Sequence, residues 1–257
     1  MRSGSELVRL DVQRHVATIT LDSPHNRNAL SRRLVAELTD HLHEAAGSDG
    51  VRVIVLTHSG GTFCAGADLT EAVAGGMERG TSALLALLQT VAALSKPVVA
   101  VVRGHVRAGG LGLVGACDVA LASEASTFAF NESLLGLAPA IISLTTRSRL
   151  AERDVARKCL TGVTFDGVEA ARSGLVTQVV PVEELDAALA ALVAEFGKVS
   201  PQGLRETKAL LNRPLLERME VDGPGLVALA ARLFSTEEAR EGMTAFRERR
   251  PASWVEQ

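Results

Sequence analysis

Aromatic side chains and an excess of one charge are both scarce in this sequence. Of its 257 residues none is tyrosine, aromatic residues make up 3%, and the net charge is −3. Surfaces that bind nucleic acid typically carry a strong basic excess and aromatic side chains on which bases stack. The composition therefore argues against a nucleic-acid partner.

Cysteine and long apolar runs are scarce as well. Cys64, Cys117 and Cys159 are scattered and odd in number, so they provide neither a disulfide framework nor a zinc-type pair. The first ten residues lack the apolar core of a signal peptide, and the most apolar helical stretch, residues 83–94, falls well short of the ~20 residues that cross a bilayer. These absences and the reduced thiols predict a soluble, cytoplasmic protein with no metal and no membrane partner.

The residues that are present indicate a packed α/β protein, because 47% are hydrophobic and 22% are charged. β-rich runs alternate with helical stretches up to about residue 180, which predicts parallel units joined by right-handed crossovers. Only helices are expected after that point, so we divide the chain into an α/β core (1–195) and a C-terminal helical region (196–257). The expected strands are 7–12, 16–21, 51–57, 98–102, 119–122 and 127–130, and the expected helices are 81–95, 185–196, 201–212, 225–234 and two that start after Ser31 and at Gly109.

Two glycine-rich turns lead from a strand into a helix, at residues 60–68 and 104–112. Gly110-x-Gly112-x-x-Gly115 matches the dinucleotide-binding pattern, which makes a nicotinamide dinucleotide one candidate ligand. Residues 103–108 separate this pattern from its strand, however, whereas the fingerprint requires a direct turn. Two helix N-termini aimed at one point form instead an oxyanion hole, because their first N–H groups are unpaired.

Three segments carry a more specific resemblance. GTFCAGADL at 61–69, RGHVRAGGLG at 103–112 with Cys117-Asp118, and the stretch 128–139 with NESLLGL resemble the signatures of the crotonase family, the enoyl-CoA hydratases and isomerases. The similarity covers nearly the whole chain. It implies a spiral of ββα turns with a C-terminal helical region that drives assembly into a homotrimer or hexamer. It also implies an acyl-CoA thioester substrate and no separate cofactor, since coenzyme A is part of the substrate.

The resemblance also implies roles for individual residues. The backbone N–H groups of Ala67 and Gly109 would hold the thioester oxygen, and Glu132 would act as the acid/base group. The expected substrate-binding residues are those matched to coenzyme A contacts and their neighbours in the two loops: Asn26, Arg27, Ala65, Gly66, Asp68, Gly110, Phe246 and Arg249.

One departure from the family pattern keeps the reaction open. The first catalytic glutamate of typical hydratases is replaced by Gly112, as in hydratases of the methylglutaconyl-CoA type, which residues 137–143 also resemble. Glu132 alone would then hydrate a 2-enoyl-CoA, or would move a double bond by shuttling one proton. In the third alternative the protein binds acyl-CoA without turning it over.

Overall fold

The N-terminal strands form the hairpin that the sequence predicts. The computed structural model describes residues 6–71 and 77–256. In it β1 (Val8–Gln13) pairs antiparallel with β2 (Val16–Leu21). Arg14 and His15, with φ of 45° and 71°, make the turn between the two strands.

Each later turn of the chain adds one strand to each of two sheets. The pairs are β3 (Val53–His58) with β4 (Thr62–Cys64), β5 (Val98–Val102) with β6 (His105–Arg107), and β7 (Val119–Ser123) with β8 (Thr127–Ala129). The larger sheet has the order β1-β2-β3-β5-β7-β10, and the smaller has the order β4-β6-β8-β9. β10 is Gln178–Val180 and β9 is Phe165–Asp166. All strand pairs are parallel except β1 with β2 and β8 with β9. The predicted α/β spiral is therefore confirmed.

Helices follow the strand pairs and bury one side against the sheets. The helix α1 (Arg32–Gly47) begins as predicted at Ser31, whose Oγ accepts a hydrogen bond from Leu34 N at 3.3 Å. Its stripe of Leu34, Leu38 and Leu42 is fully buried. The other helices that the structure describes before β10 are η1 (Pro24–Asn26), α2 (Leu69–Glu71), α3 (Met77–Ala93), α4 (Gly109–Ala116), η3 (Ser133–Leu135), α5 (Ser143–Thr146), α6 (Glu152–Thr161) and α7 (Gly167–Arg172).

The helices after β10 are, in the part of the chain that the structure describes, η4 (Val182–Glu184), α8 (Leu185–Gly197), α9 (Pro201–Phe234) and α10 (Glu237–Glu248). The expectation of separate helices at 201–212 and 225–234 is wrong, because α9 continues through Pro214 and Pro224 for 34 residues. Residue 195 lies within α8, and the division into two regions there stays a prediction. Among the helices of the described ranges, none has the length and apolarity needed to cross a membrane.

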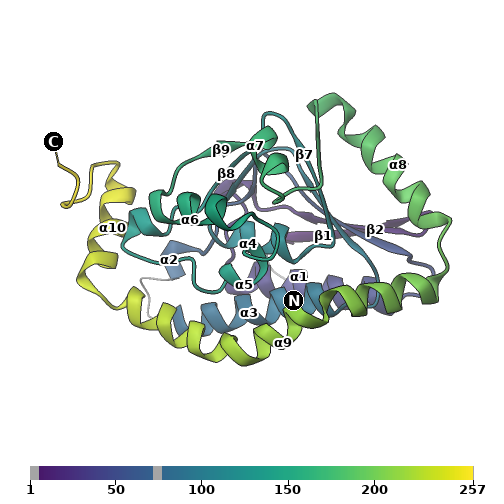
Figure 1. The fold of residues 1–257 in the computed structure, drawn as a ribbon, viewed down its shortest axis with the longest axis horizontal. Coiled ribbons are helices and arrows are strands. Elements are labelled where there is room, and N and C mark those ends of the chain that lie inside the picture. Colours follow the sequence, from purple (N-terminus) through teal and green to yellow (C-terminus); the bar gives the residue numbers. More distant parts are fainter. Residues whose placement is uncertain (1–5, 72–76, 257) are drawn as a thin grey trace.

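Packing against α3 accounts for the continuity of α9, which runs beside that helix (Figure 1). Lys208 donates from Nζ to the carbonyls of Val91 and Lys96 at 3.0 and 2.9 Å, and Asn212 donates to the carbonyl of Ala92 at 3.0 Å. The bonds to Val91 and Ala92 satisfy carbonyl groups in the last turn of α3 that lack partners within the helix, and the bond to Lys96 holds the segment that follows it. Tertiary contacts of this kind outweigh the local tendency of proline to end a helix.

Candidate active site

Three neighbouring parallel strands of the smaller sheet end at the same place. Thr62 of β4 pairs with His105 of β6, and Arg107 of β6 pairs with Ala129 of β8. The residues just beyond the carboxyl ends of these strands include Ala67, Gly109 and Glu132. Residues that are far apart in sequence are thereby brought to one edge of the sheet, where α/β folds commonly bind ligands.

The two glycine-rich turns are in direct contact. Gly66 has a φ of +89°, and a Cβ atom placed on it would lie 2.7 Å from Ala108 Cβ and 3.2 Å from Gly109 N. Only glycine permits this close approach and this backbone conformation. Ala108 is itself strained, with φ 46° and ψ −119°, as backbone at functional sites often is. Gly109 is the first residue of α4, so the helix leaves its N–H without an acceptor.

Ala67, Gly109 and Glu132 line one cavity of about 150 Å³. Its walls are mainly apolar and come from α3, from the segment 137–142, and from the C-terminal helices through Ala230, Phe234 and Phe246. Asp68, Glu71 and Glu132 are its only charged lining residues within the described ranges, so no cation lines it there. Such a cavity suits a short, uncharged hydrocarbon group.

Glu132 lines this cavity with a carboxyl group that has one unpartnered oxygen among the described residues. Its Oε2 atom is buried and finds no partner among the described residues. Burial raises the pKa of the Glu132 carboxyl to about 7, against a smaller lowering by a hydrogen bond from its own backbone N–H. A carboxyl group with a pKa near neutrality can both accept and donate a proton under working conditions.

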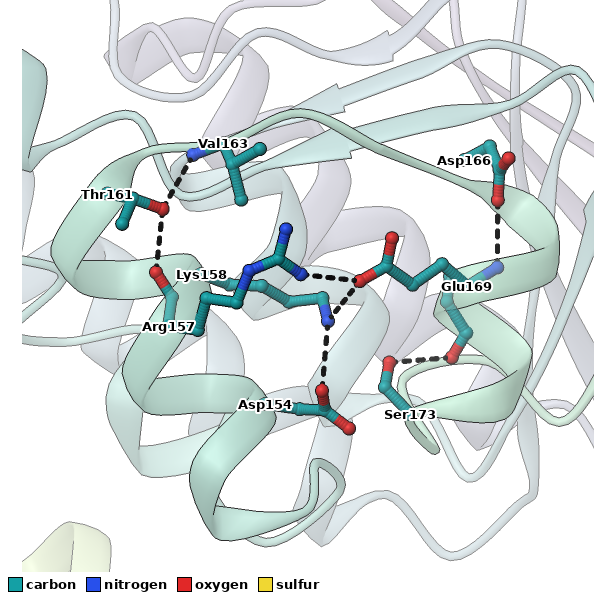
Figure 2. A network of polar contacts seen from close by, with 9 residues as sticks. Asp154, Arg157, Lys158, Thr161, Val163, Asp166, Glu169 and Ser173 are labelled. Atoms are coloured by element: carbon teal, nitrogen blue, oxygen red, sulfur yellow. Dashed lines mark hydrogen bonds and ion pairs between the residues drawn. The ribbon is translucent and has the colours of Figure 1, made fainter.

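A cluster of buried groups holds the strand that leads to Glu132. Phe165 stacks on Phe128 and on Phe130, with ring centroids 5.7 and 6.4 Å apart. Lys158 lies over the Phe165 ring at 4.7 Å and pairs with Glu169 at 2.9 Å. Figure 2 shows how this lysine on α6 reaches Glu169 on α7. The cluster fixes α6 and α7 against β8, and thereby supports the residues that follow β8.

The glycines of the dinucleotide-like pattern pack against other parts of the protein. A Cβ atom on Gly110 would lie 2.8 Å from the Cys64 carbonyl oxygen, and one on Gly112 would lie 2.7 Å from Ile142 Cγ2. One on Gly115 would lie 3.1 Å from backbone atoms of Thr145. Close packing of α4 thus explains the spacing of the glycines without a bound phosphate.

A second, larger cavity of about 1020 Å³ borders the first and is basic. Ala65, Ala67, Asp68, Asn131 and Phe246 line both cavities. The cationic or titratable basic residues of the larger cavity are His25, Arg27, His105, Arg107, Arg247 and Arg249. Such a surface suits an anionic ligand, and phosphate groups in particular.

Most predicted substrate-binding residues meet at these two cavities. Gly66 and Gly110 line neither of them, since both are buried in the packing between the turns. The residues that do line them are Asn26, Arg27, Ala65, Asp68, Phe246 and Arg249.

Arg107 and His105 are binding candidates that the sequence reasoning missed. Both are on β6 and flank the buried Val106, so their side chains share one face of the strand. Arg107 donates to the carbonyl of Thr127 at 2.8 Å and to its Oγ1 at 2.9 Å, and His105 Nδ1 lies 2.8 Å from the same Oγ1. The alternation of charged and apolar residues at 105–107 is a signal that could have identified them.

Asn28 is a third missed residue, and it positions the loop at 26–30. It is fully buried, accepts from Ser23 N at 2.7 Å and donates to the carbonyls of Thr62 and Ser59 at 2.7 and 3.1 Å. Ala65 N in turn donates to the Arg27 carbonyl at 3.1 Å. No local sequence pattern predicts hydrogen bonds between residues that are so far apart in the chain.

Comparison with known proteins agrees with this geometry. The sequence matches the enoyl-CoA hydratase/isomerase family over residues 11–257. The chain belongs to this family. Its members include a Thermus thermophilus relative that is 36% identical over 244 residues, which are 92% of this chain and 96% of the relative.

Two further relatives are similar in sequence to this enoyl-CoA hydratase/isomerase chain over almost their full length. The 2,3-dehydroadipyl-CoA hydratase of Escherichia coli is 31% identical over 253 residues, covering 96% of this chain and 97% of the relative. The crystal structure of an enoyl-CoA hydratase from Mycobacterium avium is 47% identical, with a TM-score of 0.91 over 98% of this chain and 100% of the other.

Family membership implies an acyl-CoA substrate, and the two cavities have the matching chemistry. An apolar cavity with one buried carboxyl group adjoins a basic cavity, as an acyl group and the phosphates of coenzyme A would require. Cys64 lies behind the first turn, and burial raises the pKa of its thiol to about 12. A thiol with so high a pKa is unsuited to nucleophilic attack, so Cys64 is a packing residue in this enzyme.

Proposed function

We propose that this enzyme adds water to a short 2-enoyl-CoA, with Glu132 as the acid/base group. The observation that carries the proposal is the cavity that Glu132 shares with Ala67 and Gly109. In it a buried carboxyl group of raised pKa, one oxygen of which has no partner among the described residues, lies beside two glycine-rich turns that offer backbone N–H groups. The names of the relatives support hydration as the reaction.

Each part of the site has a task in this reaction. The N–H groups of Ala67 and Gly109 stabilise the negative charge that develops on the thioester oxygen, and losing one such donor typically costs about 2.7–4 kcal/mol. The Glu132 carboxylate takes a proton from water while the water oxygen bonds to C3. The carboxyl group then gives a proton to C2, so that one H and one OH have been added.

The basic cavity holds the coenzyme A part of the substrate in this proposal. Arg27 and Arg249 pair with its phosphates, Ala65 offers backbone groups to the adenine, and Asn26 and Phe246 complete the contact. Residues 137–143 resemble the matching segment of methylglutaconyl-CoA hydratases, which act on an acyl group that carries a carboxylate. The first cavity has no cation among its described lining residues, so we expect a neutral acyl group to be preferred.

Double-bond isomerisation is the second candidate, and the surroundings of Gly112 favour it. The first catalytic glutamate of typical hydratases is absent there, and Ile142 fills the space. One carboxyl group suffices to remove a proton from C2 of a 3-enoyl-CoA and return it to C4, because no water is consumed.

The test compares the native enzyme with Glu132→Gln on crotonyl-CoA and on a short 3-enoyl-CoA. Loss of enoyl absorbance with crotonyl-CoA in the native enzyme only supports hydration, and gain of absorbance with the 3-enoyl-CoA supports isomerisation. Calorimetry with acetyl-CoA shows whether the variant still binds. Binding without turnover of either substrate by the native enzyme overturns both reactions and leaves an acyl-CoA binder.

We also propose that the chain assembles into a homotrimer or hexamer, as the family resemblance implies. Light scattering is expected to give three or six times the chain mass of 27.0 kDa. A monomeric mass would contradict this proposal.

A further inference from the structure

One wall of the acyl cavity is closed by a side chain that occupies the place of a second acid/base group. Ile142 lines the cavity and is only 3% exposed. A Cβ atom on Gly112 would lie 2.7 Å from Ile142 Cγ2, 3.2 Å from Ile142 Cβ and 3.3 Å from Leu88 Cδ1. The space that any side chain at position 112 would enter is therefore already filled by hydrocarbon.

The backbone around Ile142 is tied to α4, so it cannot easily move aside. Thr145 Oγ1 donates to the Gly112 carbonyl of α4 at 3.0 Å, and within the Ile142 segment itself Thr146 Oγ1 donates to the Ile142 carbonyl at 2.8 Å. Gly115 brings α4 against Thr145 with Cβ-position contacts of 3.1 Å. Shortening the Ile142 side chain would therefore remove the nearest contacts at position 112.

A water molecule at this wall would find no polar partner in the Ile142 side chain. Ordered water in a protein interior typically needs two to four polar neighbours. Glu132 must then hold a reacting water without help from this side. Isomerisation has no such requirement, since its proton leaves C2 for Glu132 and returns from Glu132 to C4.

We propose that Ile142 is the residue that sets the partition between water addition and double-bond migration in this enzyme. The inference rests on the proposed function, because it concerns the reaction at Glu132. It predicts that opening the space at Gly112 and placing a carboxyl group there shifts the products toward the hydrated thioester.

A stability cycle tests the steric part of the proposal without any activity. Gly112→Ala is expected to lower Tm by about 3–10 °C, because overpacking a rigid core is destabilising. The same change in an Ile142→Ala background is expected to lower Tm by less than half as much. Gly225→Ala is the matched control, since it is also helical and a Cβ atom there meets nothing within 4 Å. If Gly112→Ala is tolerated as well as Gly225→Ala while Ile142 is present, the proposal is wrong.

The product ratio tests the catalytic part. With 3-hexenoyl-CoA as the probe, the Gly112→Glu/Ile142→Ala variant is expected to raise the ratio of 3-hydroxyhexanoyl-CoA to 2-hexenoyl-CoA at least about ten-fold. Gly112→Glu alone is expected to fall short of this, because Ile142 still fills the space. Ile141→Ala, which enlarges the same cavity, is expected to change KM without changing the ratio.

The outcomes separate this inference from the proposed function. An unchanged ratio in a folded double variant, or an equal rise in Gly112→Glu alone, overturns the role of Ile142. Absence of turnover in the native enzyme with both 2-enoyl- and 3-enoyl-CoA overturns the proposed function, and with it the partition. The stability cycle then still decides whether Ile142 fills the space at Gly112.

Discussion

Burial of the Glu132 carboxyl group controls its protonation, and activity should follow that protonation. Its pKa is raised to about 7, and both candidate reactions begin with the carboxylate accepting a proton. We therefore expect kcat/KM to fall as the pH drops through about 7. A pH–rate profile from about pH 5 to about pH 9 measures this. The Glu132→Gln variant is expected to be about 10²–10⁴-fold slower, and a native profile that is flat across neutrality would argue against Glu132 as the base.

The same shift predicts a pH-dependent effect of Glu132 on stability. The pKa rises from 4.5 to about 7 on folding, so the folded protein binds this proton more tightly than the unfolded chain. The contribution of this group to the free energy of unfolding is fully present below pH 4.5 and is lost as the pH rises through about 7. The total loss is about 3 kcal/mol. Glu132→Gln does not titrate, so its Tm relative to the native protein should be higher at about pH 8 than at about pH 5. An equal difference at both values would show that the carboxyl group is not buried in solution.

At the scale of elements, the contact of α6 with α7 depends on a lysine without exposed surface. Lys158 is 0% exposed and pairs with Glu169 at 2.9 Å and with Asp154 at 3.6 Å. Figure 2 shows the lysine between these two carboxylates. Lys158→Ala removes both the charge and the packing on Phe165, and is expected to cost about 3–5 kcal/mol in urea unfolding. Lys158→Met keeps most of the volume.

The methionine variant separates packing from charge. The side chains of Glu169 and Asp154 remain 27% and 31% exposed, so water can solvate them when the lysine charge is removed. We therefore expect Lys158→Met to be clearly more stable than Lys158→Ala. Equal losses in the two variants would show that the ion pairs, and not the packing, hold α6 in place.

Elements defined by local patterns were predictable from the sequence, and those defined by distant contacts were not. The hairpin, the Ser31 cap and the start of α4 at Gly109 depend on residues adjacent in sequence, and all three are confirmed. The continuity of α9 depends on Lys208 and Asn212 reaching α3, which no local signal reveals.

The candidate site divides in the same way. The two turns and Glu132 are marked by motifs, and the structure brings them to one cavity. Ile142 and Asn28 act through contacts with residues 30 or more positions away, at Gly112 and Thr62. The roles of these two residues follow from the folded structure and not from the sequence around them.

For the whole molecule, the separation of charge between the two cavities predicts how the enzyme binds coenzyme A. The larger cavity contains Arg27 and Arg249, both exposed, whereas the smaller has only acidic charges among its described lining residues. Binding energy from such exposed cations is screened by salt, because the Debye length shrinks from about 10 Å at 0.1 M to about 3 Å at 1 M. We therefore expect the Kd for coenzyme A, measured by calorimetry, to rise with added salt.

Single substitutions locate this effect in the basic cavity. Arg27→Ala and Arg249→Ala are each expected to weaken coenzyme A binding by about 3- to 10-fold and to reduce the salt dependence, because each removes a cation that we propose as a phosphate partner. Arg213→Ala is the control, since Arg213 is exposed on α9 beside Glu217 and lines neither cavity. The same loss of affinity in the control would mean that the overall charge of the protein, and not the basic cavity, attracts the nucleotide. A loss confined to the first two variants would place the phosphates in the larger cavity and direct the acyl group toward Glu132.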